Sequence, residues 1–101
     1  MKSDIPDTPP QVIGLQNLRI VKLNGLSKIT NNSLISLCKG LQFLEHLELA
    51  RCDSITEFSV NTIIASLNSL QFIDLNFIPA ITPKELEEIR KVKPNLLIRR
   101  Y

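Results

Sequence analysis

The sequence predicts an α/β fold, a right-handed solenoid in which about 3.5 copies of a 26-residue unit stack on one another. Three observations predict it. Apolar residues recur at steps of 26 positions, short stretches alternate apolar and polar residues as strands do, and a threonine recurs before each expected helix. A fixed period of roughly 20–50 residues indicates a solenoid, because each unit buries its apolar side only against its neighbours.

The recurrence sets the boundaries of the units. The columns start at Leu15, Leu18, Val21, Leu23, Leu26, Ile29, Leu34 and Leu37, and apolar residues or cysteine follow 26 and 52 positions later. Complete repeats therefore span 15–40, 41–66 and 67–92, and a partial repeat spans 93–101. Residues 1–10 contain three prolines, two aspartates and little to bury, so we expect a disordered leader before a repeat domain at 11–101.

Each repeat predicts one strand followed by one helix. The strands are expected at Arg19–Leu23, Glu45–Leu49 and Gln71–Leu75, and the helices at Asn31–Lys39, Glu57–Ser66 and Pro83–Val92. Thr30, Thr56 and Thr82 are the expected N-caps, and Pro83 and Glu85 make the third helix start the clearest. Strands joined by helices must be parallel, which predicts a concave sheet and a convex layer of helices.

The partial fourth repeat predicts an edge strand. With the 26-residue step maintained, Leu96 continues the Leu18 column, whereas Arg99 interrupts the Val21 column. The same step points Ile98 and Arg100 outward.

Composition excludes several classes of function. The formal charge of +2 comes from scattered basic residues, which disfavours nucleic-acid binding. No apolar segment approaches the roughly 20 residues that span a bilayer. Cys38 and Cys52 lack the spacing of a zinc site and are expected to be small apolar core residues, which favours a reducing compartment. We therefore predict an intracellular protein, cytoplasmic or nuclear, with mitochondria as an alternative.

Residues 44–56 carry a family resemblance. The run from Leu44 through Leu47, Leu49 and Cys52 to the Ile55-Thr56 pair resembles the pattern L-x-x-L-x-L-x-x-C-x-x-I-T of cysteine-containing leucine-rich repeats. In that family the column of Cys52 forms side-chain hydrogen bonds, which Leu26 and Ile78 cannot do. Such repeats commonly bind substrates in F-box ubiquitin-ligase subunits, and they recur in cell-cycle antagonists and in a mitochondrial ATP synthase coupling factor. The resemblance implies a protein-interaction module.

No set of residues predicts catalysis, a metal site or a cofactor. His46, the sole histidine, is expected on the concave face beside Glu45 and Glu48, where a lone surface histidine is the simpler interpretation. A glycine-rich phosphate loop is not expected from three glycines. We therefore expect a protein that is not an enzyme.

The outward residues of the strands are the predicted protein-binding site. One interpretation is a self-satisfied charge ladder that pairs Lys22 with Glu48 and Asp74 with Arg100. The other is a mixed apolar and charged patch that binds a protein partner. The candidate residues are Ile20, Lys22, His46, Glu48, Arg51, Phe72, Asp74, Phe77, Ile98 and Arg100.

An exposed first repeat is a second candidate interface. Leu15, Leu18 and the strand edge near Val21 would be covered by homodimerisation or by docking against a larger complex. The sequence thus supports two hypotheses: a recognition module like those of F-box ligase subunits, or a small structural or assembly subunit of a large complex.

Overall fold

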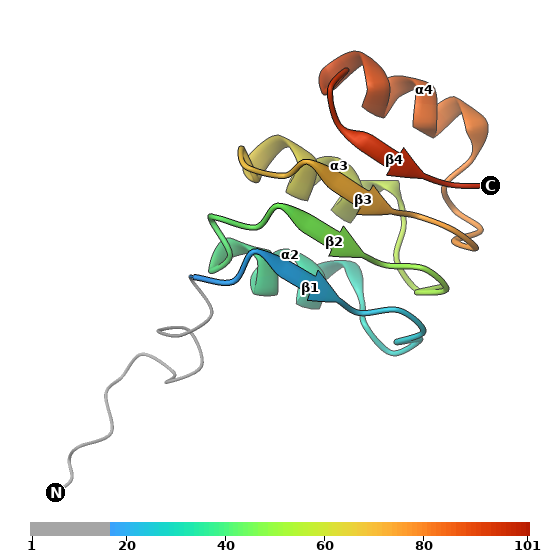
Figure 1. The fold of residues 1–101 in the computed structure, drawn as a ribbon. Coiled ribbons are helices and arrows are strands. Elements are labelled where there is room, and N and C mark those ends of the chain that lie inside the picture. The colour runs from blue at the N-terminus through green and yellow to red at the C-terminus, as the bar shows by residue number, and fades with distance from the viewer. Residues whose placement is uncertain (1–16) are drawn as a thin grey trace, which may run out of the picture.

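A computed structural model describes residues 17–101 as a four-stranded parallel sheet with three helices on one of its faces (Figure 1). The elements are β1 (Ile20–Lys22), α2 (Asn31–Lys39), β2 (His46–Glu48), α3 (Glu57–Ser66), β3 (Phe72–Asp74), α4 (Pro83–Val92) and β4 (Leu97–Arg99). The three predicted helices are confirmed, and each predicted strand is observed as a three-residue core. The predicted leader and the Leu15 position lie outside the described residues.

Threonine caps begin all three helices, as predicted. Thr56 accepts a hydrogen bond from the Phe58 amide, and Thr82 accepts one from Glu85. The full reciprocal capping box is at Thr30, however, where the Ser33 hydroxyl also accepts from the Thr30 amide at 2.8 Å. At Thr82 the predicted cap and the proline in the first turn are both present, and the Glu85 carboxylate accepts from the threonine hydroxyl at 3.1 Å.

The sheet has the order β1-β2-β3-β4, and its register departs from the sequence period at the last strand. Residues 26 apart pair between the first three strands, as in Ile20 with His46 and His46 with Phe72. Phe72 pairs with Leu97, only 25 positions later. The outward placement predicted for Ile98 is therefore wrong, since Ile98 pairs with Ile73 and packs against the core.

The step from β3 to β4 is one residue shorter than the period, and the difference lies in the turn that precedes the strand. The Arg19 carbonyl accepts from the amides of both Glu45 and His46, and the Glu45 carbonyl accepts from both Gln71 and Phe72. The Gln71 carbonyl accepts from Leu97 alone, so β4 starts one residue earlier. Because β4 starts one residue earlier, Leu96 is buried and Ile98 points inward. A full 26-residue step would have placed Arg99 inward instead.

Arg100 is also placed differently from its prediction. It lies two residues after the inward Ile98, and its Nη2 donates to the Ile81 carbonyl at 2.8 Å, where the predicted partner was Asp74. The side chain is half-buried, and within residues 17–101 its Nε is buried without a hydrogen-bond partner. Arg100 therefore lies against the end of the core and is removed from the predicted binding face.

The core is formed by the repeated columns between the sheet and the helices. Leu44, Leu47 and Leu49 of the second unit are fully buried, as are Ile73 and Leu75 of the third. Hydrogen bonds also join successive units: the Asn31 side chain donates to the Thr56 hydroxyl and accepts from the Thr56 amide, both at 2.9 Å. Neighbouring units are thus joined by hydrogen bonds between side chains and backbone as well as by packing.

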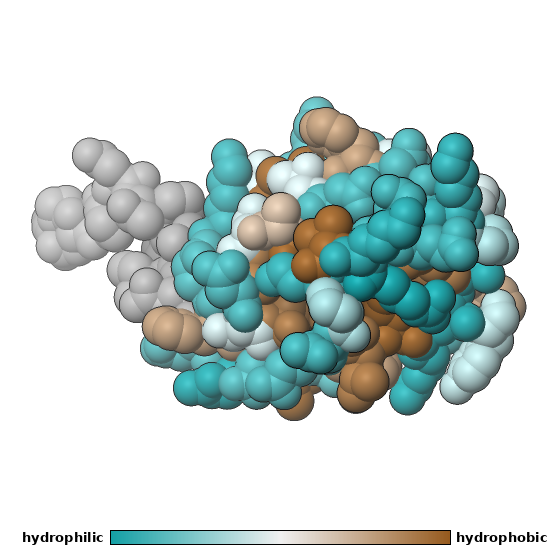
Figure 2. Space-filling model, turned by 90° about the horizontal axis from the view of Figure 1, so that it is seen from above, coloured by the Kyte–Doolittle hydropathy of each residue, from teal (hydrophilic) through white to brown (hydrophobic). Residues whose placement is uncertain are grey.

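The two ends of the sheet differ in how far their apolar side chains are buried. In the unit of β4 and α4, Leu86, Ile89 and Leu96 are buried, and hydrophilic residues make up most of the surface at this end (Figure 2). In the unit of β1, Leu18 and Leu26 are 36% and 47% exposed. The described structure is therefore covered at the α4 end and leaves apolar columns accessible at the β1 end.

One backbone feature recurs with the period and was not predicted. Gly25, Arg51 and Phe77 lie 26 positions apart, just after the strands, and have φ values of 79°, 64° and 58°. This left-handed conformation suits glycine and strains other residues. The second and third units therefore have Arg51 and Phe77 in a strained conformation that glycine adopts without strain in the first unit.

Candidate functional site

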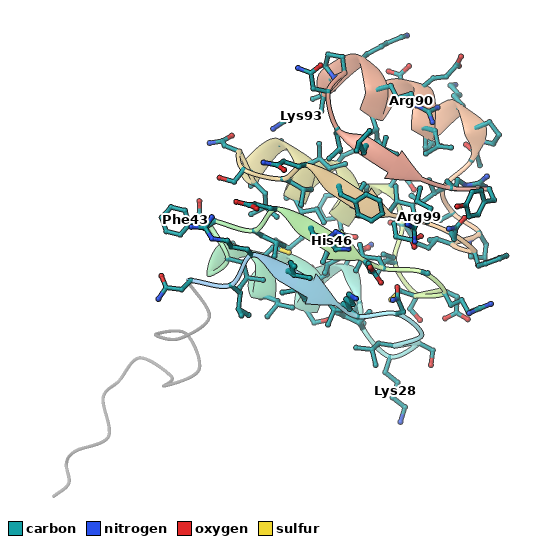
Figure 3. All side chains as sticks on the ribbon, in the orientation of Figure 1. Lys28, Phe43, His46, Arg90, Lys93 and Arg99 are labelled. Atoms are coloured by element: carbon teal, nitrogen blue, oxygen red, sulfur yellow. The ribbon has the colours of Figure 1, made fainter. Side chains whose placement is uncertain are left out.

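The outward side chains of the four strands form the face of the sheet that none of the three described helices covers, which we call the open face. It consists of Ile20, Lys22, His46, Glu48, Phe72, Asp74, Leu97 and Arg99. The helices lie behind this sheet, whereas His46 and Arg99 project in front of it (Figure 3). The residues form an apolar and aromatic row and, beside it, a charged row.

The apolar row is ordered by stacking across strands. The His46 imidazole lies parallel to the Phe72 ring, with ring centroids 4.3 Å apart and an interplanar angle of 15°. The Arg99 guanidinium lies over the same phenyl ring, 5.1 Å from its centroid. Ile20 and Leu97 flank the stack and are mostly exposed. Side chains from the two neighbouring strands, β2 and β4, thus hold Phe72 in a defined position at the centre of the face.

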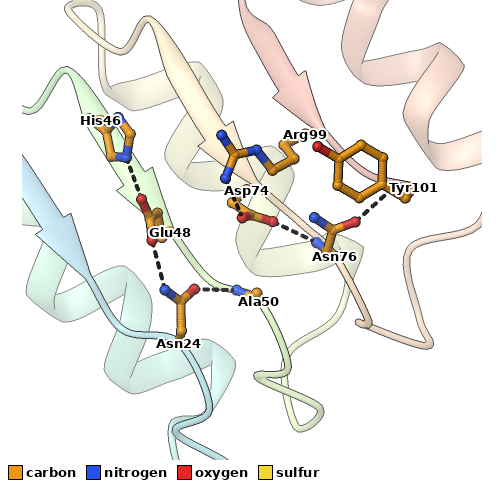
Figure 4. Close-up of polar contacts among 8 residues, drawn as sticks. All are labelled: Asn24, His46, Glu48, Ala50, Asp74, Asn76, Arg99 and Tyr101. Atoms are coloured by element: carbon orange, nitrogen blue, oxygen red, sulfur yellow. Dashed lines mark hydrogen bonds and ion pairs between the residues drawn. The ribbon is translucent and has the colours of Figure 1, made fainter.

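Glu48 is the centre of the polar contacts on the β1 side of the face (Figure 4). Its carboxylate lies 2.7 Å from His46 Nε2 and accepts from Asn24 Nδ2 at 2.7 Å. Asn24 Oδ1 in turn accepts from the Ala50 amide at 2.8 Å. The hydrogen bond with His46, followed by the one from Asn24, holds the pKa of Glu48 below its ordinary value of 4.5.

Asp74 and Asn76 form the corresponding cluster on the β4 side (Figure 4). Asp74 is almost fully buried and accepts from the Asn76 amide at 3.0 Å. Its second oxygen lies 3.7 Å from Arg99 Nη1, so the ion pair predicted with Arg100 is formed by Arg99 instead. Asn76 Oδ1 accepts from the Tyr101 amide at 2.6 Å.

Arg51 and Phe77 lie at the rim of the open face, at the left-handed positions described above. The Arg51 guanidinium is 4.8 Å from the centroid of the Phe77 ring, and both side chains are exposed. Strained backbone conformations cluster at active sites and ligand-binding segments, which makes these two residues candidates for the edge of the site.

The structure brings most of the predicted site residues together. Ile20, Lys22, His46, Glu48, Phe72 and Asp74 share the open face, with Arg51 and Phe77 at its rim. Ile98 and Arg100 are not part of it. Leu97 and Arg99 replace them. The sequence signal that could have revealed this is the apolar pair Leu96 and Ile98, two positions apart and followed by Arg99. Asn24 and Asn76 were also missed, although they stand two periods apart.

Both cysteines are free and buried in the core, where they fill space as small apolar residues. Burial raises the pKa of Cys38 to about 11, and burial also raises that of Cys52. The Cys52 thiol donates to the Leu23 carbonyl at 3.0 Å, which is the type of hydrogen bond that the cysteine column implies. A raised pKa disfavours the reactive thiolate at both positions.

Comparisons with known proteins do not assign the chain to a family. No protein-family model matches it, and a search of curated proteins finds no match. Within residues 17–101, no group of three or more histidine, cysteine, aspartate or glutamate side chains could hold a metal ion. None of the three described helices has the length and apolar character needed to cross a membrane.

Proposed function

We propose that this chain is a short leucine-rich-repeat solenoid of the cysteine-containing class, and that it binds a protein partner on its open face without catalysing a reaction. Parallel strands in which residues 26 apart pair, helices confined to one face, and the Cys52 hydrogen bond support the solenoid. The leading functional hypothesis is a recognition module similar to those of F-box ubiquitin-ligase subunits.

The observation that carries the proposal is the exposed apolar row on the open face. Ile20, Phe72 and Leu97 lie on β1, β3 and β4, and His46 on β2 lies between the first two and stacks on Phe72. Aromatic rings, arginine and fixed apolar side chains are the residues that protein interfaces favour. Because the parallel strands lie about 4.8 Å apart, the row is long enough to contact several residues of a partner.

Binding is favoured over catalysis by how the polar side chains are engaged. Glu48 and Asp74 already accept hydrogen bonds from neighbouring groups, and His46 is held by both Glu48 and Phe72. Both thiols are buried with raised pKa values, which suits core packing in a reducing, intracellular compartment.

The test is quantitative affinity purification with wild-type protein and with Ile20→Asn and Leu97→Asn. Phe58→Asn is the matched control, because Ile20 and Phe58 are both 59% exposed and Phe58 lies on α3. We expect partner proteins that wild type and the control recover equally and that both open-face variants lose. Equal recovery by all four proteins would remove the open face as the binding site.

A second candidate function, a structural or assembly subunit of a large complex, is favoured by the accessible end at β1. Leu18 and Leu26 are exposed there, and Val21, Leu23 and Ile29 are only partly buried. Homodimerisation or docking into an assembly would cover these side chains. Light scattering over a range of concentrations tests this directly: mass that rises with concentration supports self-association, and a constant monomer mass argues against it.

A further inference from the structure

The open face has nearly balanced formal charges, but its accessible charges are unequal. Two ion pairs and one histidine–glutamate contact lie at or beside it, and in each the acid is the more buried partner. The exposed side-chain fractions are 62% and 37% for Arg19 and Glu45, 48% and 8% for Arg99 and Asp74, and 30% and 15% for His46 and Glu48. An approaching partner therefore meets mainly the basic groups.

The acids of the face also have less capacity left for new contacts. One oxygen of Glu48 accepts a hydrogen bond from Asn24, and the other faces His46. Asp74 accepts from the Asn76 amide and is screened by Arg99. Carboxylates that are buried and hydrogen-bonded in this way position other groups and present little negative charge to a ligand.

The basic groups, by contrast, keep free donors. Arg99 Nη1 is 3.7 Å from Asp74, beyond the roughly 2.7–2.9 Å of a charge-assisted hydrogen bond. Arg99 and Arg51 each rest a guanidinium over a phenyl ring, which leaves the N–H groups at its edge available. Lys22 and Arg51 are exposed and form no ion pair within residues 17–101.

We propose that the open face selects an acidic segment of a partner protein, with an apolar or aromatic side chain of that segment packed on the row from Ile20 to Leu97. Carboxylates of the segment meet Lys22, Arg51 and Arg99. This inference rests on the proposed function and adds the chemistry of the partner. Charge complementarity of this kind accelerates association and selects among partners more than it adds affinity.

The test uses a random linear peptide library displayed on phage, panned against the full chain. We expect enriched peptides that carry net negative charge and at least one large apolar or aromatic residue. For a synthesised enriched peptide, fluorescence anisotropy should show affinity lowered about tenfold by combining Lys22→Gln with Arg99→Gln, and lowered further by added salt.

Arg90→Gln is the matched control for Arg99→Gln, because it removes the same charge from α4, away from the open face (Figure 3). It should change affinity by less than about twofold. Thermal unfolding of each variant confirms that it is folded.

The outcomes separate the two proposals. Neutral or basic peptides that lose binding with Leu97→Asn overturn the acidic partner and leave the open face as the binding site. Peptides that bind Leu97→Asn as well as wild type overturn both proposals, and a library that yields no enriched peptide also counts against both.

Discussion

Apolar residues of the same column are buried at one end of the described sheet and exposed at the other. At the α4 end, Leu96 is 7% exposed, and the Arg100 side chain donates a hydrogen bond to the Ile81 carbonyl just before α4. At the β1 end, Leu18 occupies the same column as Leu96 and is 36% exposed. The periodic sequence alone therefore does not determine how well a unit is packed, because position in the stack and the residues that cover the end also matter.

The largest expected effect is a difference in stability within that column. Leu44→Ala and Leu96→Ala should each lower the free energy of unfolding by about 2–5 kcal/mol, because both side chains are buried. Leu18→Ala should lower it by about 1 kcal/mol, since much of its surface is already in water. Urea unfolding monitored by circular dichroism measures all three. An equal loss for Leu18 and Leu96 would mean that the two ends are packed alike.

A smaller change in stability is expected at the left-handed positions, where the first unit has glycine and the second and third units have arginine and phenylalanine. Gly25→Ala should lower the free energy of unfolding by about 1–2 kcal/mol through strain alone, since no atom of the described residues lies within 4 Å of the added methyl group. Phe77→Gly should raise it by roughly 0.5–1 kcal/mol, because the exposed ring contributes little burial. Thermal and urea unfolding would contradict this if Gly25→Ala were neutral.

A still smaller effect concerns pH and the polar cluster that links the first two units. The pKa of Glu48 is lowered in the folded protein, so its stabilising contribution is fully present above the unfolded value of 4.5. It is lost as the pH falls below 4.5 and through the folded value. Unfolding measured across this range should show a shallower pH dependence in Glu48→Gln than in wild type, and equal slopes would exclude this contribution.

The smallest expected change in stability comes from Leu26→Lys at the β1 end. Because Leu26 is about half exposed, the free energy of unfolding should change by no more than about 0.5 kcal/mol. If this end mediates self-association, light scattering should nevertheless show a lower mass for the variant at high concentration. Val92→Lys on α4 is the control and should leave the mass unchanged. The same decrease for both variants would contradict a specific role of the β1 end.

Much of the fold could be predicted because local and repeated signals agreed. The threonine caps, Pro83 and the apolar columns all placed the helices at the same residues, and the observed bounds confirm them. The register of β4 could not be predicted from the period, because two signals conflict there. The 26-residue step favours an inward Arg99, whereas local alternation favours an inward Ile98, and burial of the isoleucine prevails.

The candidate site was predicted less completely, for reasons of side-chain geometry. The period identifies which residues face outward, so Ile20, His46 and Phe72 were found together. It does not reveal that Asn24 binds Glu48, that Asp74 is nearly buried, or that Arg99 packs over Phe72. These contacts depend on side-chain reach between strands, which a pattern of residue types does not encode.

The recurring left-handed turn has a consequence for engineering. Its shape is set by the backbone, so the side chains at 51 and 77 are held at the rim of the sheet while contributing little to the core. Asparagine and aspartate tolerate this conformation better than most other residues, and glycine best of all. Because Arg51 and Phe77 already occupy this conformation, other exposed side chains could be installed at both positions at the cost of similar backbone strain.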